Sequence, residues 1–490
     1  MKVLLINPPW QRFFGVTLST PAIAVNHIAS YIERELPGCT IDVYDADQSG
    51  NVSFSFDNSR YAYAHQEYVK RLKDPADPVW EEVRNVIHDF RPDVVGVSAM
   101  TATYSSALEV SRIAKEWNPG VVVVLGGYHP SALPEDTLRN ENVDYVVIGE
   151  GEVTFRELLL HLENPEEVQG IAYRNGNGHI SRTPLRPTIE NIDELPIPVF
   201  KSSINNYGHS DGAGLNLWYL VGARGCPFQC TYCASDKTVR YRSIEHIMRE
   251  IVHVREKHGI NQFFFMDDSF SLIRTRAIEL CGLLKKSGIK WRCNTRVDLV
   301  DEALVSIMKE SGCLSTSVGI ETGSPKTMKM IRKNIQYEKV RTALDLFRKY
   351  DIAVAGFFII GFPWETREDM EQTLNLIREL PLDDFQLNIA TPLPGTQLFQ
   401  SLVDAGKIDI AVEDWSRYQQ GSPYMNYSSC TDEEWSRMII EYIGKASRIY
   451  RRKKIKRIFQ KMLHDPIQSA RIMTYMAGRL IGFSSPRNPL

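Results

Sequence analysis

The 490-residue sequence lacks a strong excess of either charge, and its N-terminus lacks a long apolar run. Its 57 basic and 60 acidic residues leave a net charge of −3, which gives no global electrostatic reason to expect nucleic-acid binding. The apolar run after Met1 meets Pro8 and Pro9, too early for a signal peptide or a membrane span. We therefore expect a cytoplasmic protein without a nucleic-acid partner.

Cysteine is also scarce, with eight residues in the chain. Five of them stand far apart, which indicates reduced thiols rather than a disulfide framework: Cys39, Cys281, Cys293, Cys313 and Cys430. The other three, Cys226, Cys230 and Cys233, are concentrated in the stretch ARGCPFQCTYCAS with a CxxxCxxC spacing. What these three cysteines hold is the main question that the sequence raises.

The chain is longer than one hydrophobic core usually supports, so two or three domains are expected. In residues 1–195, short apolar runs alternate with amphipathic stretches such as Ala107–Trp117. The runs are Val3–Asn7, Ile41–Asp45, Val94–Ser98, Val121–Gly127 and Tyr145–Gly149. This pattern predicts a doubly wound, Rossmann-like α/β domain with a parallel sheet covered on both faces. A hairpin with Asn-Gly turn signals follows at Ile171–Ser181, and the proline-rich stretch IDELPIPVF marks the domain boundary.

Residues 196–400 contain a second series of six apolar runs, each separated from the next by a helical pattern such as Ser243–His258 or Arg367–Leu380. Six strand-helix repeats are fewer than the eight of a closed (β/α)₈ barrel but follow the same order, so we expect a partial (β/α)₆ barrel. Residues 401–490 are expected to form a helical C-terminal domain. Their stretch ASRIYRRKKIKRIFQKML combines apolar residues with a dense basic run.

The cysteine spacing favours one kind of metal site over others. A structural zinc site needs four protein ligands, and the chain has no second cysteine pair. A catalytic zinc site can use three ligands but usually recruits histidine or carboxylate; it remains an alternative, as does chance proximity of three buried cysteines. Three thiolates on one short loop beside Gly225 and Pro227 are more typical of an iron-sulfur cluster.

The CxxxCxxC spacing, with Tyr232 before the last cysteine, resembles the radical S-adenosylmethionine (SAM) superfamily over residues 217–395. The resemblance implies a [4Fe-4S] cluster on the three cysteines, whose open iron binds SAM and whose electron cleaves it to a 5′-deoxyadenosyl radical. It also implies SAM-binding positions after later strands. These are Asp267 and Asp268 for the methionyl amine, Glu321 for the ribose and Gly361 for the adenine side. Arg296 is a candidate for the SAM carboxylate or the substrate; each position alone is equally consistent with a structural role.

The first domain resembles the cobalamin-binding domain of the cobalamin-dependent radical SAM subgroup. Ser98 and Met100, followed by Gly126 and Gly127, are similar to that fold's SxL and GG elements, which make room for the nucleotide tail. In the stretch GEGEVTF, backbone amides from Gly149 and Glu150 onward are further candidates for cofactor contact. Glu150 and the nearby Glu152 are equally suited to be partners of the helix dipole.

The histidine motif DxHxxG of cobalamin-binding domains is absent after the first strand, where the sequence reads NPPWQRFFG. We therefore expect base-off cobalamin without a protein histidine on cobalt. His129, in GGYHP, is the nearest candidate ligand but lies on a different loop. Its expected role is to pack near the cofactor.

Together these features predict a methyltransferase that methylates an unactivated carbon, using a 5′-deoxyadenosyl radical and methylcobalamin. A non-methylating enzyme of the same subgroup, such as an oxidative cyclase or a rearrangement or coupling enzyme, is the alternative. A cobalamin-binding sensor with a vestigial barrel is less consistent with three intact cysteines. A methylthiotransferase would need a second three-cysteine cluster in the first domain, where Cys39 stands alone.

The expected partners are a small-molecule, lipid or peptidyl substrate and an external one-electron donor such as flavodoxin or ferredoxin. The basic segment from Lys445 to Arg457 is interleaved with apolar residues, so it could form an amphipathic helix at a membrane surface or against an acidic substrate. A solvated helix packed on the barrel is the simpler interpretation.

Overall fold

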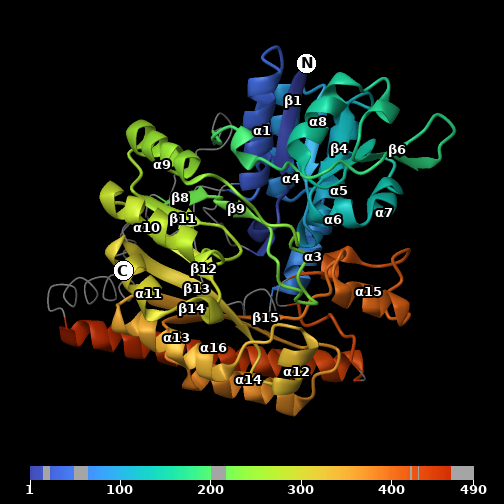
Figure 1. Cartoon of the computed structure of the whole chain (residues 1–490). Helices are drawn as coiled ribbons and strands as arrows, with labels where there is room; N and C mark the ends of the chain where they lie inside the picture. The colour runs from blue at the N-terminus through green and yellow to red at the C-terminus, as the bar shows by residue number, and fades with distance from the viewer. Residues whose placement is uncertain (15–21, 49–63, 200–216, 420–421, 429, 465–490) are drawn as a thin grey trace, which may run out of the picture.

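The computed structural model describes residues 1–14, 22–48, 64–199, 217–419, 422–428 and 430–464, with side chains as far as Lys454. An α/β domain lies above a partial barrel in Figure 1, and the long helix α16 runs along the base of the barrel. Phe200 at the end of the predicted boundary, residues 201–216 of the predicted second domain and residues 465–490 of the predicted third lie outside the described residues.

The first sheet has seven strands. In spatial order they are β2 (Thr40–Asp45), β1 (Lys2–Asn7), β3 (Val94–Ser98), β4 (Val122–Gly126), β5 (Tyr145–Val147), β6 (Ile171–Arg174) and β7 (Ile180–Arg182). The first five are parallel, which confirms the doubly wound prediction, and their carboxyl ends meet at one edge. The predicted hairpin forms as β6 and β7 and extends this sheet in antiparallel fashion.

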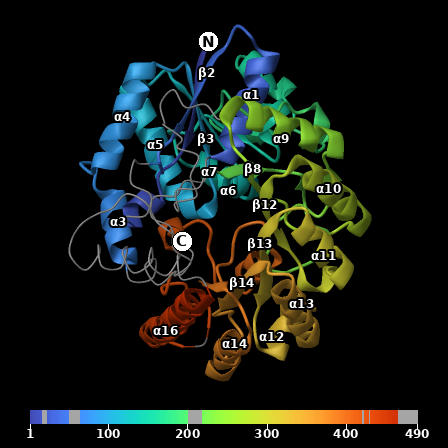
Figure 2. The same cartoon turned by 90° about the vertical axis from the view of Figure 1, so that its left-hand side faces the viewer.

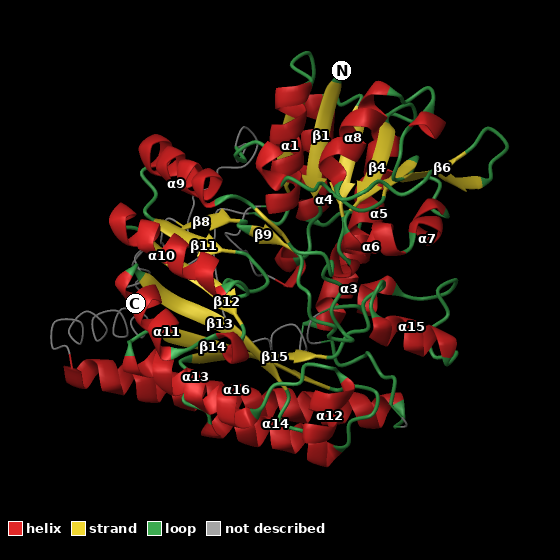
Figure 3. Ribbon diagram, in the orientation of Figure 1, coloured by secondary structure: helices red, strands yellow, loops and turns green. Residues whose placement is uncertain are grey.

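Alternating side chains of each strand enter two separate cores, because successive residues of a strand point to opposite faces. Leu4 and Ile6 pack with helices α4 (Pro78–Phe90) and α5 (Tyr104–Trp117) on one face. Val3 and Leu5 pack with α1 (Ile23–Glu35) and α8 (Gly151–Leu160) on the other. Strands buried on both faces explain why the sequence shows continuous apolar runs here. Figure 3 shows the strands with helices on either side.

The second sheet is the predicted open barrel of six parallel strands. They follow chain order: β8 (Leu217–Leu220), β11 (Gln262–Phe265), β12 (Lys290–Thr295), β13 (Cys313–Glu321), β14 (Ala353–Ile360) and β15 (Asp384–Ile389). Their helices are α9 (Ile244–His258), α10 (Arg274–Ser287), α11 (Glu302–Glu310), α12 (Pro325–Met330), α13 (Tyr337–Lys349) and α14 (Arg367–Glu379). In Figure 2, α9, α10, α11 and α13 follow one another around the outer side of the strands. Cys281, Cys293 and Cys313 are buried in this core.

The apolar side chains of the C-terminal segment pack into two of the three cores, the barrel core and the first-domain core that includes α4 and α5. Helix α15 (Gln397–Asp404) and the 3₁₀ helix η6 (Trp415–Arg417) pack in the first-domain core through Phe399, Trp415 and neighbouring residues. Helix α16 (Asp432–His464) packs on the barrel through residues from Trp435 to Ile449. The exposed side chains of its basic run include Arg448, Arg451, Arg452 and Lys454. No helix among the described residues is long and apolar enough to cross a membrane.

Candidate cofactor site between the two sheet edges

The three cysteines lie on a loop that is closed at its base by a short antiparallel ribbon of β9 (Ala223–Arg224) and β10 (Arg240–Tyr241). Gly225 begins the loop with φ of +91°, and a Cβ atom there would lie 2.2 Å from the carbonyl oxygen of Thr238. The amide of Cys226 donates to the Asp236 carbonyl at 2.7 Å. Glycine is therefore required where the chain enters the loop.

All three thiols are free, with Cys230 buried and Cys226 and Cys233 half-buried. Burial raises the pKa of Cys226 and Cys233, and Asp268 adds to the rise. Binding of a metal would favour the thiolate form of both. Lys237 opposes this rise for both thiols. Its Nζ is buried without a hydrogen-bond partner among the described residues.

The donor set and the unpartnered cation fit an anionic, thiolate-ligated cluster. A buried ammonium group without a hydrogen-bond partner is costly, and the negative charge of a cluster held by three thiolates would stabilise it. In the described part of the chain, no three His, Cys, Asp or Glu side chains are placed to hold a single metal ion. A cubane binds each thiolate through a different iron, so it fits three cysteine side chains that lie farther apart than the ligands of one zinc ion.

Tyr232 connects the cysteine loop to Glu321 at the end of β13. Its hydroxyl lies within electrostatic range of the Glu321 carboxylate, and burial together with that carboxylate raises the pKa of Tyr232 well above its usual value. Glu321 has a left-handed backbone (φ 71°) and accepts from Lys333 Nζ at 2.9 Å. Both members of this ion pair are buried. A strained, buried carboxylate at a strand end is typical of a functional site. Lys333 carries no sequence signal, because its loop has no periodic pattern.

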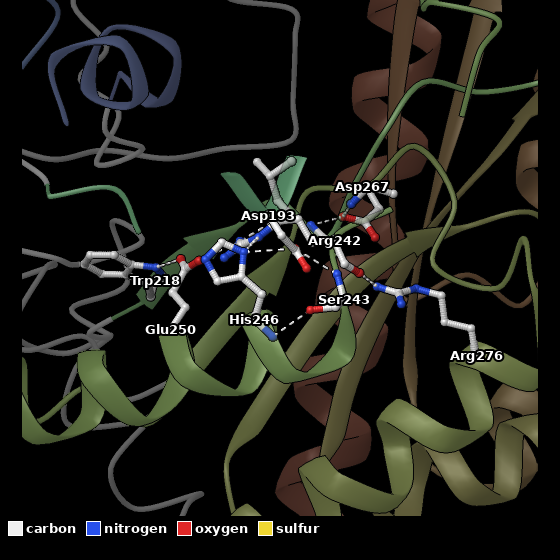
Figure 4. A network of polar contacts seen from close by, with 11 residues as sticks. Asp193, Trp218, Arg242, Ser243, His246, Glu250, Asp267 and Arg276 are labelled. Carbon is white, nitrogen blue, oxygen red and sulfur yellow. Dashed lines mark hydrogen bonds and ion pairs between the residues drawn. The ribbon is translucent and has the colours of Figure 1, made fainter. Parts of the chain in front are cut away.

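Asp267 and Asp268 follow β11 and have different surroundings. Asp267 is buried and accepts from the amides of Gly222 (2.6 Å) and Ala223 (3.0 Å) through Oδ1. Burial raises its pKa to about 6. Figure 4 shows it beside Arg242, in a polar network that continues to Glu250. Asp268 is exposed and accepts from Ser235 Oγ in the cysteine loop. Asp268 is thus the better placed of the two to reach a ligand.

Arg296 and Gly361 also lie at this barrel edge. The Arg296 guanidinium group lies 3.6 Å from the ring centroid of Phe228, which belongs to the cysteine loop, and forms an ion pair with Asp298 at 2.9 Å. Arg296 therefore supports the cysteine loop and is also a candidate to bind the SAM carboxylate or the substrate. Gly361, with φ of +87°, donates its amide to Glu365 at 2.7 Å and lies against Trp435 of α16.

The predicted first-domain residues meet at the carboxyl edge of the first sheet. Ser98 and Gly126 are register partners on β3 and β4. A Cβ on Gly127 (φ +100°) would lie 2.6 Å from the Ala99 carbonyl oxygen. The Gly149 amide donates to Ser131 Oγ at 3.0 Å.

The same edge carries two large exposed apolar side chains, Met100 (51% exposed) and Tyr128 (62%). An apolar edge of this kind fits a broad, flat cofactor such as a corrin. Tyr128 also lies within electrostatic range of Asp268, Cys233 and Arg224, so this edge faces the cysteine loop.

His129 lies inside the protein rather than at the edge. Its side chain is 0% exposed, stacks on Tyr104 with 3.8 Å between ring centroids and meets Trp415 edge-on. Its Nδ1 lies 3.3 Å from Thr101 Oγ1. Burial lowers its pKa to about 3. The ring therefore reaches no open space in which it could ligate a cofactor.

Glu150 has partners that the sequence did not predict. Its carboxylate forms ion pairs with Arg224 (2.5 Å) and Arg240 (2.7 Å) of the barrel domain and accepts from the Ile189 amide. Burial raises the pKa of Glu150, but the two guanidinium groups more than offset this and leave it lowered. Both carboxylate oxygens are thus occupied by protein donors. Side-chain ion pairs between distant segments leave no local pattern by which they could be found in the sequence.

Comparisons with known proteins agree with this geometry. The family model of the Radical SAM superfamily matches residues 220–377, and that of the B12 binding domain matches residues 16–159. An uncharacterized methyltransferase of Pyrococcus horikoshii is 33% identical over 90% of this chain and 91% of its own length. The anaerobic magnesium-protoporphyrin IX monomethyl ester cyclase of Rubrivivax gelatinosus is 30% identical over 70% of this chain and 64% of its own.

Among solved structures, the radical S-adenosylmethionine methyltransferase TsrM from Kitasatospora setae, with cobalamin and a [4Fe-4S] cluster bound, has the same fold. The TM-score is 0.64 at 17% identity, over 82% of this chain and 78% of TsrM. Two family matches lie on the two domains in the predicted order, and a relative above 30% identity spans nearly the whole chain. The chain belongs to the cobalamin-dependent radical SAM enzymes.

Proposed function

We propose that this enzyme methylates an unactivated carbon with the help of SAM, a [4Fe-4S] cluster and cobalamin. The observation that carries the proposal is the opposition of two sheet edges. The cysteine loop, at the carboxyl edge of the barrel, faces Tyr128 at the carboxyl edge of the first sheet. A radical formed at one edge therefore lies next to a methyl donor held at the other.

The three cysteines would hold the cluster and the edge around Gly127 would hold cobalamin. When bound, these groups supply a 5′-deoxyadenosyl radical and a transferable methyl group. The residues of this chain bind and orient these groups and exclude water from them. Asp268, which is exposed, would accept from the methionyl amine of SAM, while buried Asp267 fixes the backbone at Gly222 and Ala223.

The remaining SAM contacts are proposed at the ends of the later strands. Glu321, held by Lys333 and Tyr232, faces the ribose, and the backbone at Gly361 lies on the adenine side. Arg296 offers a guanidinium group toward the SAM carboxylate or the substrate, with its ring contact to Phe228 keeping it beside the cluster loop.

Cobalamin is proposed to bind base-off without a histidine on cobalt. The support is the position of His129, whose ring is enclosed between Tyr104 and Trp415. We propose a flavodoxin or ferredoxin as the electron donor, and a small molecule, lipid or peptidyl group as the substrate.

A second candidate function is a radical reaction without methyl transfer. It is favoured by the similarity to the Rubrivivax gelatinosus cyclase at 30% identity, only slightly below that of the Pyrococcus horikoshii methyltransferase. The same cofactors and the same residues around SAM would serve it.

The test is product analysis with methyl-labelled SAM after anaerobic reconstitution. We expect label in the product, with one S-adenosylhomocysteine and one 5′-deoxyadenosine formed per methyl group transferred. The Cys230→Ala variant should lose cluster absorbance and all 5′-deoxyadenosine. Turnover without label in the product would replace methyl transfer with the second candidate, and an unaffected Cys230→Ala variant would contradict both.

A further inference from the structure

Both ends of the cysteine loop form ion pairs with the first domain. Arg224 and Arg240 are directly opposite each other on β9 and β10, the ribbon that closes the loop. Arg224 donates to Glu150 (2.5 Å) and to Glu152 (2.6 Å), and Arg240 donates to Glu150 at 2.7 Å. The two glutamates stand at the start of α8, immediately after β5. Four side chains thus connect the cysteine loop to the first sheet.

These contacts are largely shielded from water. The exposed fractions of the side chains are 22% for Arg224, 8% for Arg240, 17% for Glu150 and 6% for Glu152. Each of the four charges has an oppositely charged partner among them, and Arg240 also forms an ion pair with Asp236 of the cysteine loop at 3.3 Å, so no buried charge is left without a partner. Charge-assisted bonds from a planar guanidinium group are directional, and Arg224 uses two different nitrogens for its two glutamates. Such a cluster fixes geometry even where its net contribution to stability is small.

A second attachment lies close by. Asp193, in the segment that follows the first sheet, accepts from the Ser243 amide at 2.9 Å and lies 3.0 Å from His246 Nδ1, at the start of α9. Figure 4 shows these residues on the same polar network as Arg242 and Asp267. Arg240 also donates to the Ile189 carbonyl at 2.7 Å. The segment from Glu150 to Asp193 therefore holds the barrel on both sides of the cysteine loop.

We propose that Glu150, Glu152, Arg224 and Arg240 form an interdomain clamp that sets the position of the cysteine loop relative to the carboxyl edge of the first sheet. The inference deepens the proposed function and rests on it, because the clamp then sets the distance from the cluster to cobalamin. The four are positioning residues: they act through the loop and touch neither reacting group. A shifted loop would still form the radical but would deliver it less often to the methylation step.

The most informative variant is Glu152→Gln. It removes one charge and keeps the shape, and Arg224 retains Glu150, so no guanidinium group is left unpaired. Glu157→Gln is the matched control, because Glu157 lies on the same helix and forms its ion pair with Arg186, outside the barrel domain. Arg224→Lys tests the geometry: it keeps the charge but cannot bridge two carboxylates in a fixed plane.

Two measurements on the full-length, reconstituted protein test the clamp. Hydrogen exchange of the segment 225–239 should be at least tenfold faster in Glu152→Gln, intermediate in Arg224→Lys and unchanged in Glu157→Gln. The magnetic interaction between the reduced cluster and Co(II) in bound cobalamin should weaken in the same order. Iron and cobalamin contents should stay at the wild-type level, and 5′-deoxyadenosine released per product should rise severalfold.

Unchanged loop exchange in Glu152→Gln would overturn the clamp, and so would an equal change in Glu157→Gln. If hydrogen exchange of the loop were faster in Glu152→Gln but the magnetic interaction between cluster and Co(II) stayed unchanged, the clamp would not set the position of the cluster. A wild-type protein that binds no cobalamin would instead contradict the proposed function, and the exchange measurement would still decide whether the clamp exists.

Discussion

At the scale of single residues, Lys237 is the clearest candidate for a functional residue that the motif does not include. The CxxxCxxC pattern identifies the ligands but not the cation beside them, because Lys237 lies four residues beyond Cys233 in an irregular loop. A positive charge near the cluster favours its reduced, more negative state. Lys237 should therefore raise the reduction potential of the cluster.

We expect Lys237→Met to lower the ratio of reduced to oxidised cluster about tenfold at a fixed potential, which corresponds to about 59 mV for a one-electron couple. Potentiometric titration followed by electron paramagnetic resonance measures this. Lys257→Met, at an exposed position on α9, is the control and should leave the potential unchanged. Equal potentials in wild type and Lys237→Met would show that the buried Nζ does not act on the cluster.

Gly127 illustrates a residue whose role the sequence does indicate. A left-handed φ and a Cβ contact of 2.6 Å with the Ala99 carbonyl oxygen would both oppose a side chain there. Gly127→Ala should lower the free energy of unfolding by about 1–3 kcal/mol and weaken cobalamin binding, since the chain must shift at the cofactor edge. Gly38→Ala, where a Cβ meets no atom within 4 Å, should have little effect. Calorimetry and equilibrium dialysis with cobalamin compare the two variants.

At the scale of elements, the apolar runs allowed both sheets to be predicted. Parallel strands buried on two faces need continuous apolar residues, and the helices between them need a one-sided pattern, so local sequence carries this information. The ribbon β9–β10 could not be predicted in this way, since two residues per strand give no periodicity. Nor could the attachment of β6 to β5, because strand pairing depends on residues that are distant in the chain.

Asp47, in the loop after β2, should make the free energy of unfolding depend on pH. Asp47 accepts from the amides of Trp10, Gln11 and Arg12 through Oδ1 and so caps the 3₁₀ helix η1 (Gln11–Phe14). Burial raises the pKa of Asp47 to about 7. The folded state then binds the proton more tightly than the unfolded state does, so the contribution of Asp47 to the free energy of unfolding is full below pH 4 and is lost as the pH rises toward 7.

Asp47→Asn keeps the accepting oxygen but cannot ionise. We expect its free energy of unfolding to depend less on pH between 4 and 7 than that of wild type, by about 3 kcal/mol over the interval. Urea denaturation at several pH values measures the difference. The same slope in both proteins would mean that Asp47 is ionised across the whole range.

At the scale of the whole molecule, the C-terminal segment joins the two cores. The sequence predicts it to be helical but does not show where its apolar faces go, since amphipathic periodicity does not identify the surface that covers it. In the structure, Trp415 and Tyr418 complete the first-domain core while Trp435 and Tyr442 complete the barrel core. The segment that follows the barrel in the chain thus stabilises the first domain, which precedes the barrel.

Gln419 is the polar centre of this connection, and its side chain is 0% exposed. Its Oε1 accepts from Trp10 Nε1 in the loop after β1, while its Nε2 donates to Tyr68 Oη at 3.0 Å and to the Ala102 carbonyl at 2.9 Å. Gln419→Ala would remove these hydrogen bonds and open a cavity, at a cost of about 1–3 kcal/mol for each buried group left unsatisfied. The loops it joins, after β1 and β3, belong to the edge where we propose that cobalamin binds.

We therefore expect Gln419→Ala to lower the melting temperature by several degrees and, through those loops, to weaken cobalamin binding. Gln400→Ala is the matched control, because Gln400 is exposed and, among the contacts described, its side chain donates only to Asp404 on its own helix. Calorimetry with and without cobalamin separates the two effects, since a bound ligand raises the melting temperature according to its affinity. Wild-type stability in Gln419→Ala would mean that water replaces the amide, and that packing alone joins the C-terminal segment to the first domain.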